Sequence, residues 1–149
     1  MFDRWYDDLR VGDRRSYRGV TMTEAHIVNF AGVSGDWNPK HVDAEFARNT
    51  PLGQRVPHGL LLLSCALGRT PIDPERILRF LGMDEVRFII PAFIGDTIHP
   101  VLHITDKEDA EGGGIVRLRL EVVSQKTEIL LTAKLSMLFA SRANPASSS

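Results

Sequence analysis

Two residues with acid–base side chains lie five positions apart in the segment Asp36-Trp37-Asn38-Pro39-Lys40-His41. An ionised Asp36 can accept a proton, and the imidazole of His41 can donate or accept one near neutral pH. A regular helix would separate the two side chains by more than a face. Pro39 lacks an amide hydrogen and disfavours helical geometry at Asn38, so the segment is predicted to be a rigid loop. In such a loop both side chains can point into one cavity and act as general acid–base groups.

Simpler interpretations exist for the same residues. Asp36 is also typical of a turn, and His41 of an imidazole on the surface. Together with Asp43 and His58 they could be taken for a metal site, but their spacing matches no metal-binding motif and we expect no metal ion. His58 is expected to be structural.

The first half of the chain is predicted to be helix and loop. A helix is expected up to Gly35, because glycine readily adopts the left-handed conformation at a helix end. Its start is open between two interpretations. Thr21 and Glu24 have the spacing of a capping box, and Thr23 is a competing N-cap.

A second helix is predicted just after Pro57, which is tolerated near a helix start. The segment His58–Leu67 is apolar on nearly every side, and a short helix of this kind is predicted to be buried. Gly68 can end it. Residues 69–80 contain two prolines and are predicted to be a loop.

From residue 84 onwards the apolar residues alternate, which predicts an antiparallel meander of four strands. A weaker strand is predicted over residues 14–20, and Pro100 predicts an edge or a bulge. The simplest fold is α+β: a curved antiparallel sheet wrapped around the long buried helix. We expect one domain over residues 1–141 and a small polar tail over residues 142–149. One sheet covers only part of the helix, so a second subunit is expected to cover the rest.

The composition limits the class of protein. The chain has 149 residues, 43% of them apolar, which suits a single globular domain. Its 18 Lys and Arg against 19 Asp and Glu show no basic excess, so no nucleic-acid partner is expected. The single Cys65 cannot form an internal disulfide. No apolar run approaches the roughly 20 residues that span a bilayer, and the N-terminus lacks a signal-peptide core. We therefore expect a cytoplasmic protein with no membrane partner.

The segment Phe30–His41, the small Ala47 and the later Val56-Pro57-His58-Gly59 together resemble the MaoC-like dehydratase family, which includes R-specific enoyl-CoA hydratases. That family's signature runs aromatic, small, aliphatic, Ser or Thr, Gly, Asp, any residue, Asn, Pro, aliphatic, His, five residues and a small one. The Gly-Asp-Thr at 95–97 and the order of elements over residues 5–140 are also similar. Lys40 departs from the pattern, because the family usually has an aliphatic residue there.

The resemblance implies a single hot-dog domain, a homodimer or higher homo-oligomer, and no cofactor. It also implies reversible addition of water across the 2,3 double bond of an acyl-CoA or acyl-carrier-protein thioester. Asp36 and His41 would be the catalytic pair that holds one water. Gly59, at the start of the buried helix, would let a backbone N–H stabilise the enolate oxygen. The simpler interpretation of Gly59 is a glycine that merely begins a helix.

Four further residues are assigned to substrate binding. Asn38 is expected to shape the loop or orient a catalytic side chain, and Lys40 to place a positive charge near the pocket mouth. Ser64 is expected to line the pocket, although a hydrogen bond to a carbonyl one turn back is an equal alternative. Ser34 is the fourth residue assigned to substrate binding.

Other functions remain open at this point. The chain could be a non-catalytic acyl-thioester-binding protein or a subunit of a fatty-acid dehydratase complex. A thioesterase on a related fold is also conceivable.

Overall fold

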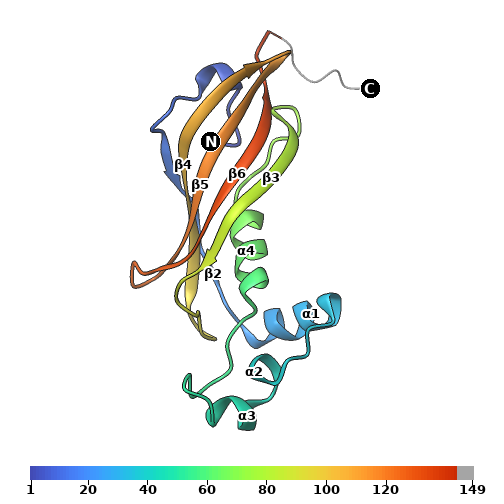
Figure 1. Cartoon of the computed structure of the whole chain (residues 1–149), viewed down its shortest axis with the longest axis vertical. Helices are drawn as coiled ribbons and strands as arrows, with labels where there is room; N and C mark the ends of the chain where they lie inside the picture. The colour runs from blue at the N-terminus through green and yellow to red at the C-terminus, as the bar shows by residue number, and fades with distance from the viewer. Residues whose placement is uncertain (144–149) are drawn as a thin grey trace.

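The computed structural model describes residues 1–143, which form one antiparallel sheet with helices against one face and at one end (Figure 1). The sheet has six strands in the order β1-β4-β5-β6-β3, and β2 also pairs with β4. The strands are β1 (Arg14–Ser16), β2 (Val20–Thr21), β3 (Ile77–Phe88), β4 (Thr97–Ala110), β5 (Gly113–Ser124) and β6 (Ile129–Ala140). The helices are the short η1 (Tyr6–Asp8), α1 (Glu24–Ser34), α2 (Pro39–Val42), α3 (Ala44–Arg48) and α4 (Gly59–Gly68).

The central strands follow from the alternation in the sequence. In β5 the side chains of Val116, Leu118 and Leu120 are buried in the core, whereas Arg119 on the opposite face is exposed. The hairpins β4–β5 and β5–β6 form a meander, as predicted. The prediction that all four strands form one meander was wrong. Strand β3 pairs with β6 at the far edge of the sheet rather than with β4, the next strand in the sequence. Periodicity identifies a strand but does not say which edge it joins.

Strand β3 begins at Ile77, so the prediction of a loop over residues 69–80 was wrong at its end. Its pairing with β6 is interrupted by three register shifts. Leu78, Phe80 and Leu81 are all exposed, which removes the alternation that marks a half-buried strand. An irregular edge strand therefore looked like a loop in the sequence.

The strand predicted near the N-terminus is interrupted in the structure. The expected strand over residues 14–20 consists of two short strands, β1 and β2, which both pair with β4. Pro100 lies inside β4 between these partners and β5, so the prediction of a sheet edge was wrong, and the bulge in β4 falls later, between Ile104 and Asp106. The carbonyl of Pro100 accepts a hydrogen bond from the Tyr17 N–H in the interval between β1 and β2.

Helix α4 lies against the concave face of the sheet (Figure 1), as the wrapped-helix fold requires. Leu62, Leu63 and Ala66 belong to the same core cluster as the inward-facing residues of β4, β5 and β6. In the single chain α4 is not buried on every side, because Leu60 is 59% exposed and Ser64 is also exposed, which agrees with the expectation that one sheet covers only part of the helix. One face of the helix is thus left uncovered by its own sheet.

Helices α1, α2 and α3 gather at one end of the sheet, near the first turn of α4 (Figure 1). The N-cap of α1 is Thr23, whose backbone N–H donates to Nδ1 of His26, and not Thr21, which lies in β2. Gly35 ends the helix in the left-handed conformation with φ of 75°, as predicted. The chain therefore turns sharply into the segment that carries Asp36.

Residues 1–141, expected to form the domain, all fall within the described structure, and the six residues 144–149 of the expected tail lie outside it. In the described part, no helix has both the length and the apolar character needed to cross a membrane.

Candidate active site

A chain of local hydrogen bonds fixes the loop between α1 and α2. The Ser34 hydroxyl donates to the Phe30 carbonyl at 2.6 Å and accepts from the Asp36 N–H at 3.2 Å. The Asp36 Oδ1 atom in turn accepts from the Asn38 N–H at 3.2 Å. These short-range turns orient the second carboxylate oxygen, Oδ2.

Asn38 begins α2. Its side chain accepts from the Lys40 N–H at 3.2 Å, and Pro39 occupies the first helical position, where no N–H is needed. This single turn of helix carries His41 inward, and His41 is only 4% exposed. The prediction of a loop over Asp36–His41 was wrong for its second half, because Pro39, Lys40 and His41 lie in α2.

His41 is held in one tautomer. Its Nδ1 lies 2.6 Å from the Val56 carbonyl oxygen, and because a carbonyl can only accept, Nδ1 carries the proton. In the neutral ring the lone pair is then on Nε2, which lies 3.8 Å from Oδ2 of Asp36. Burial lowers the pKa of His41; the Val56 carbonyl opposes this, and the nearby His58 and Lys40 reinforce it. The neutral form is therefore favoured at pH 7.

His58, expected to be only structural, is part of the same cluster. Its ring stacks on that of His41 with centroids 3.8 Å apart and an interplanar angle of 27°. Its Nε2–H donates to the backbone carbonyl of Asp36 at 2.9 Å, and the residue is 3% exposed. His58 thus contacts both members of the predicted pair. The sequence signal was its place before Gly59, but its contact with residue 36 is a tertiary one.

Asp36, His41 and His58 each offer one potential ligand atom, and these atoms lie within 4.8 Å of one another. Two stacked rings direct their in-plane lone pairs side by side rather than toward a common point, and Nε2 of His58 already donates to a carbonyl. Asp43, the fourth residue considered, instead caps α3 by accepting from the Phe46 N–H. The geometry thus suits proton transfer better than metal ligation.

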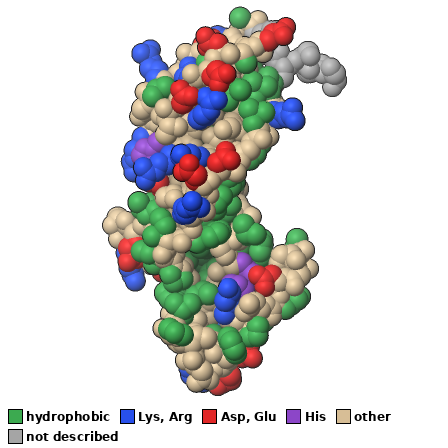
Figure 2. All heavy atoms as spheres, in the orientation of Figure 1, with side chains coloured by type: hydrophobic (Ala, Val, Ile, Leu, Met, Phe, Trp, Pro, Cys, Tyr) green, Lys and Arg blue, Asp and Glu red, His purple; other side chains and the backbone are tan. Residues whose placement is uncertain are grey.

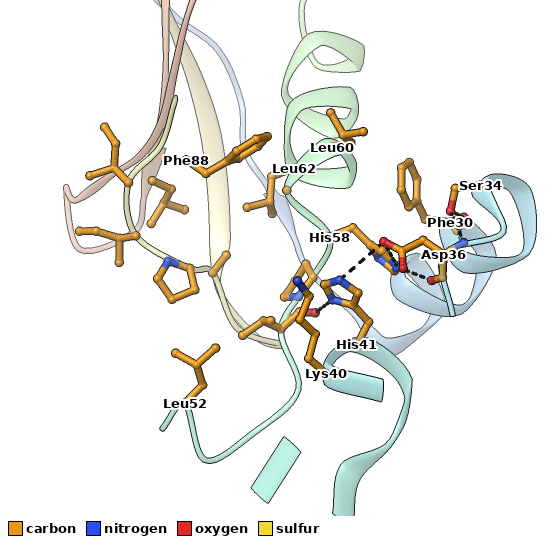
Figure 3. A pocket seen from close by; sticks show the side chains of 18 residues that line it. Phe30, Ser34, Asp36, Lys40, His41, Leu52, His58, Leu60, Leu62 and Phe88 are labelled. Carbon is orange, nitrogen blue, oxygen red and sulfur yellow. Dashed lines mark hydrogen bonds and ion pairs between the residues drawn. The ribbon is translucent and has the colours of Figure 1, made fainter. Parts of the chain in front are cut away.

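The cluster opens into a cavity of about 760 Å³ at the first turn of α4 (Figure 3). One side of the cavity is polar and the other side is apolar. The polar side carries Asp36, His41 and His58. The apolar side is formed largely by Leu52, Leu60, Leu62, Phe88, Ile89, Ile90 and Pro91.

Gly59 lines this cavity at the start of α4. The first N–H groups of a helix have no intrahelical partner, and here the side chain of His58 does not cap them. A Cβ atom at position 59 would lie 2.6 Å from the ring of Phe88, closer than real contacts allow. Glycine is therefore what lets another group approach the backbone here.

The structure brings together five of the seven residues predicted for the site: Ser34, Asp36, Lys40, His41 and Gly59 all line the cavity. Asn38 does not, and acts instead on the backbone as the N-cap of α2. Ser64 does not line it either, and its hydroxyl donates to the Leu60 carbonyl at 2.8 Å, which was the alternative interpretation.

The apolar side of the cavity continues into an exposed surface. Leu60, Phe88 and Ile89 are 59%, 55% and 54% exposed. Figure 2 shows hydrophobic side chains collected across the waist of the molecule, with histidine, acidic and basic side chains grouped beside them. The cavity is therefore open toward a large apolar surface in the single chain.

The sequence is similar to known proteins over most of its length. The MaoC like domain family matches residues 10–126. An (R)-specific enoyl-CoA hydratase of Rhodospirillum rubrum is 32% identical over 104 residues, covering 68% of this chain and 69% of that protein. Protein MaoC of Klebsiella aerogenes is 38% identical over 98 residues, covering 65% of this chain, and the match spans only 29% of the relative's length.

Solved structures give the same result for the fold. The X-ray structure of a protein from Archaeoglobus, described as a monoamine oxidase regulatory protein, superposes with a TM-score of 0.85 at 35% identity, over 93% of this chain and 95% of that one. A Mycobacterium tuberculosis protein with a double hotdog fold superposes with a TM-score of 0.79 at 20% identity, over 95% of this chain and 46% of that one. The chain has a hot-dog fold and belongs to the MaoC-like dehydratase family.

Proposed function

We propose that this protein is an (R)-specific hydro-lyase that adds water to, or removes it from, the 2,3 double bond of an acyl thioester. The observation that carries the proposal is the pair of proton acceptors at the cavity wall. Oδ2 of Asp36 and Nε2 of His41 are 3.8 Å apart, too far for a direct hydrogen bond. A water molecule can bridge polar atoms at that separation.

The reaction follows from what each group can do. A water held between Asp36 and His41 attacks C3 of the enoyl thioester while one of the two acceptors takes its proton. The same pair then returns a proton to C2, so the free enzyme is regenerated without a net gain of protons. Charge that develops on the thioester oxygen is stabilised by the unpaired N–H groups at Gly59. His58 keeps the pair aligned through its contacts with both residues.

A direct assay tests the proposal. Incubation with a short 2-enoyl-CoA is expected to remove the absorbance of the conjugated thioester without releasing free thiol. Release of thiol would instead identify a thioesterase, and tight binding without any turnover would identify a non-catalytic acyl-thioester protein.

The rate is expected to fall on acidification. Hydration needs an ionised Asp36 and a neutral His41. Burial lowers the pKa of His41 from its ordinary 6.5, so the acidic limb of kcat/KM is expected below pH 6.5. A pH profile measured with a saturable enoyl thioester gives this limb. A limb at or above pH 7 would contradict the role of neutral His41.

Metal chelation is expected to leave the rate unchanged, because the proposed steps use only protein groups and water. The protein is dialysed against EDTA and assayed before and after addition of Zn²⁺. Loss of turnover that Zn²⁺ restores would show that Asp36, His41 and His58 act as ligands instead.

The working unit is proposed to be a homodimer. The edge strand β3 presents Leu78, Phe80 and Leu81 to solvent, and Leu60 and Phe88 are also exposed, beside the cavity. An apolar surface on a sheet edge with free backbone groups favours pairing with another chain. A second copy would also close the open side of the cavity. Sedimentation velocity is expected to report a dimer, and a monomer at micromolar concentration would contradict this.

A further inference from the structure

We propose that Lys40 binds a carboxylate at the far end of the substrate's acyl group, so that the preferred substrate is a short enoyl thioester of a dicarboxylic acid. The inference rests on the proposed hydro-lyase function and adds a substrate class to it. It arises from the ammonium group of Lys40, because the addition of water does not require a cation in the cavity.

Lys40 is exposed to solvent but forms part of the cavity wall. It lines the same cavity as Asp36 and His41. In Figure 3 its side chain runs past the ring of His41 into the cavity, and its positive charge contributes to the lowered pKa of His41. Its backbone N–H is held by Asn38, so the start of the side chain is fixed by the same N-cap that positions His41.

The ammonium group of Lys40 makes no hydrogen bond and no ion pair with any of residues 1–143. Other cations near the site are already engaged. Arg48 is paired with Glu45, and Arg55 is paired with Glu24. The Lys40 charge is therefore available to a ligand, and it lies in a cavity whose opposite side is apolar.

The distance between the double bond and each anionic group of the substrate determines which anion Lys40 can bind. Consecutive Cα atoms are about 3.8 Å apart, so the base of the Lys40 side chain is next to that of His41, which acts at the double bond. A carboxylate one or two carbons beyond C3 falls within reach of such a side chain. The phosphates of coenzyme A are separated from the double bond by the whole pantetheine arm.

A carboxylated acyl chain also needs a cation in this cavity. Asp36 is the carboxylate among the lining residues, and like charges repel in a site that is partly shielded from water. Lysine supplies a compact positive charge for one carboxylate oxygen. The aliphatic residue that the family usually has at this position would favour a plain hydrocarbon chain instead.

Two matched substrates test the inference. Pent-2-enoyl-CoA ends in a methyl group, and the mono-CoA thioester of pent-2-enedioic acid ends in a carboxylate at the same position. The wild-type protein is expected to prefer the second by roughly ten- to a hundredfold in kcat/KM, as for one hydrogen bond to a charged group. In Lys40→Met this ratio is expected to fall to about one or below, and in Lys40→Arg to stay above one. Added salt is expected to lower the wild-type ratio.

Lys126→Met is the matched control, because Lys126 is an exposed lysine in the β5–β6 turn and does not line the cavity. It is expected to keep the wild-type ratio. A wild-type ratio near one, or a ratio that Lys40→Met does not change, would overturn the inference while leaving the hydro-lyase function in place. Failure to hydrate either substrate would overturn both.

A third substrate distinguishes the source of the anion. The pantetheine thioester of pent-2-enoic acid has the reacting group but lacks the nucleotide phosphates. If Lys40→Met weakens turnover of pent-2-enoyl-CoA yet leaves the pantetheine thioester unaffected, the bound anion is a phosphate of coenzyme A, and the assignment to an acyl carboxylate is wrong. Equal effects on these two substrates, whose acyl groups are both uncharged, support the acyl assignment.

Discussion

Asp36→Asn is expected to lower kcat for hydration of a short 2-enoyl-CoA by about 10²–10⁴-fold, the range typical of a positioned acid–base group. An amide cannot take a proton from the attacking water. The fold is expected to survive, because an Asn side chain can still accept the Asn38 N–H and because the Asp36 side chain is 51% exposed. Initial rates and thermal unfolding, measured on the same preparation, check both statements.

His41→Gln is the companion to this change, since it removes the second acceptor. The double variant is expected to be little slower than either single one, because groups that act as a unit are not additive. Asp43→Asn is the matched control: Asp43 lies close by in sequence but only caps α3, and Asn caps a helix as well as Asp does. A double variant whose losses multiply would contradict a shared water.

Gly59→Ala is the second change with a large expected effect, a loss of about 10²-fold in kcat/KM. The new Cβ would fall 2.6 Å from the ring of Phe88, and it would hold the thioester oxygen away from the first N–H groups of α4. Phe88 is 55% exposed, so its ring can move aside and the protein is expected to fold. Steady-state kinetics on folded protein give the effect.

A second variant separates the two causes of that loss. Phe88→Leu combined with Gly59→Ala removes the aromatic ring that the new methyl group meets. If the loss persists, close approach of the substrate to the backbone is what glycine provides. Full recovery in the double variant would show that position 59 matters only through packing against Phe88.

Much of the site was predictable because it is local. Gly35, Asp36, Asn38 and Pro39 interact mainly with residues two to four positions away, through caps and turns that have known sequence signatures. The single turn of α2 places His41, but its side chain contacts Val56 and His58, which lie far along the chain. The half-buried strands were equally predictable, because their side chains alternate between core and solvent. In both cases, short-range geometry determines the structure.

The features that were missed depend on tertiary packing. His58 meets residue 36 only because the first turn of α4 lies near α1 and α2 in the folded chain, and no spacing in the sequence indicates that its ring stacks on His41. Strand β3 lost its alternation because its exposed face is apolar. The hydroxyl of Ser64 donates to a carbonyl of its own helix. The sequence left this bond and a place in the cavity wall as equal alternatives.

The central claim is that Asp36 and His41 direct water to C3 of an enoyl thioester. The most direct test is to run the wild-type reaction in ¹⁸O-labelled water and locate the label by mass spectrometry. We predict one ¹⁸O in the 3-hydroxyl group of an intact 3-hydroxyacyl-CoA, and no label there when Asp36→Asn is used for the same short time. Label found in a free carboxylate, with coenzyme A released, or equal labelling by the wild type and the variant, would contradict the account.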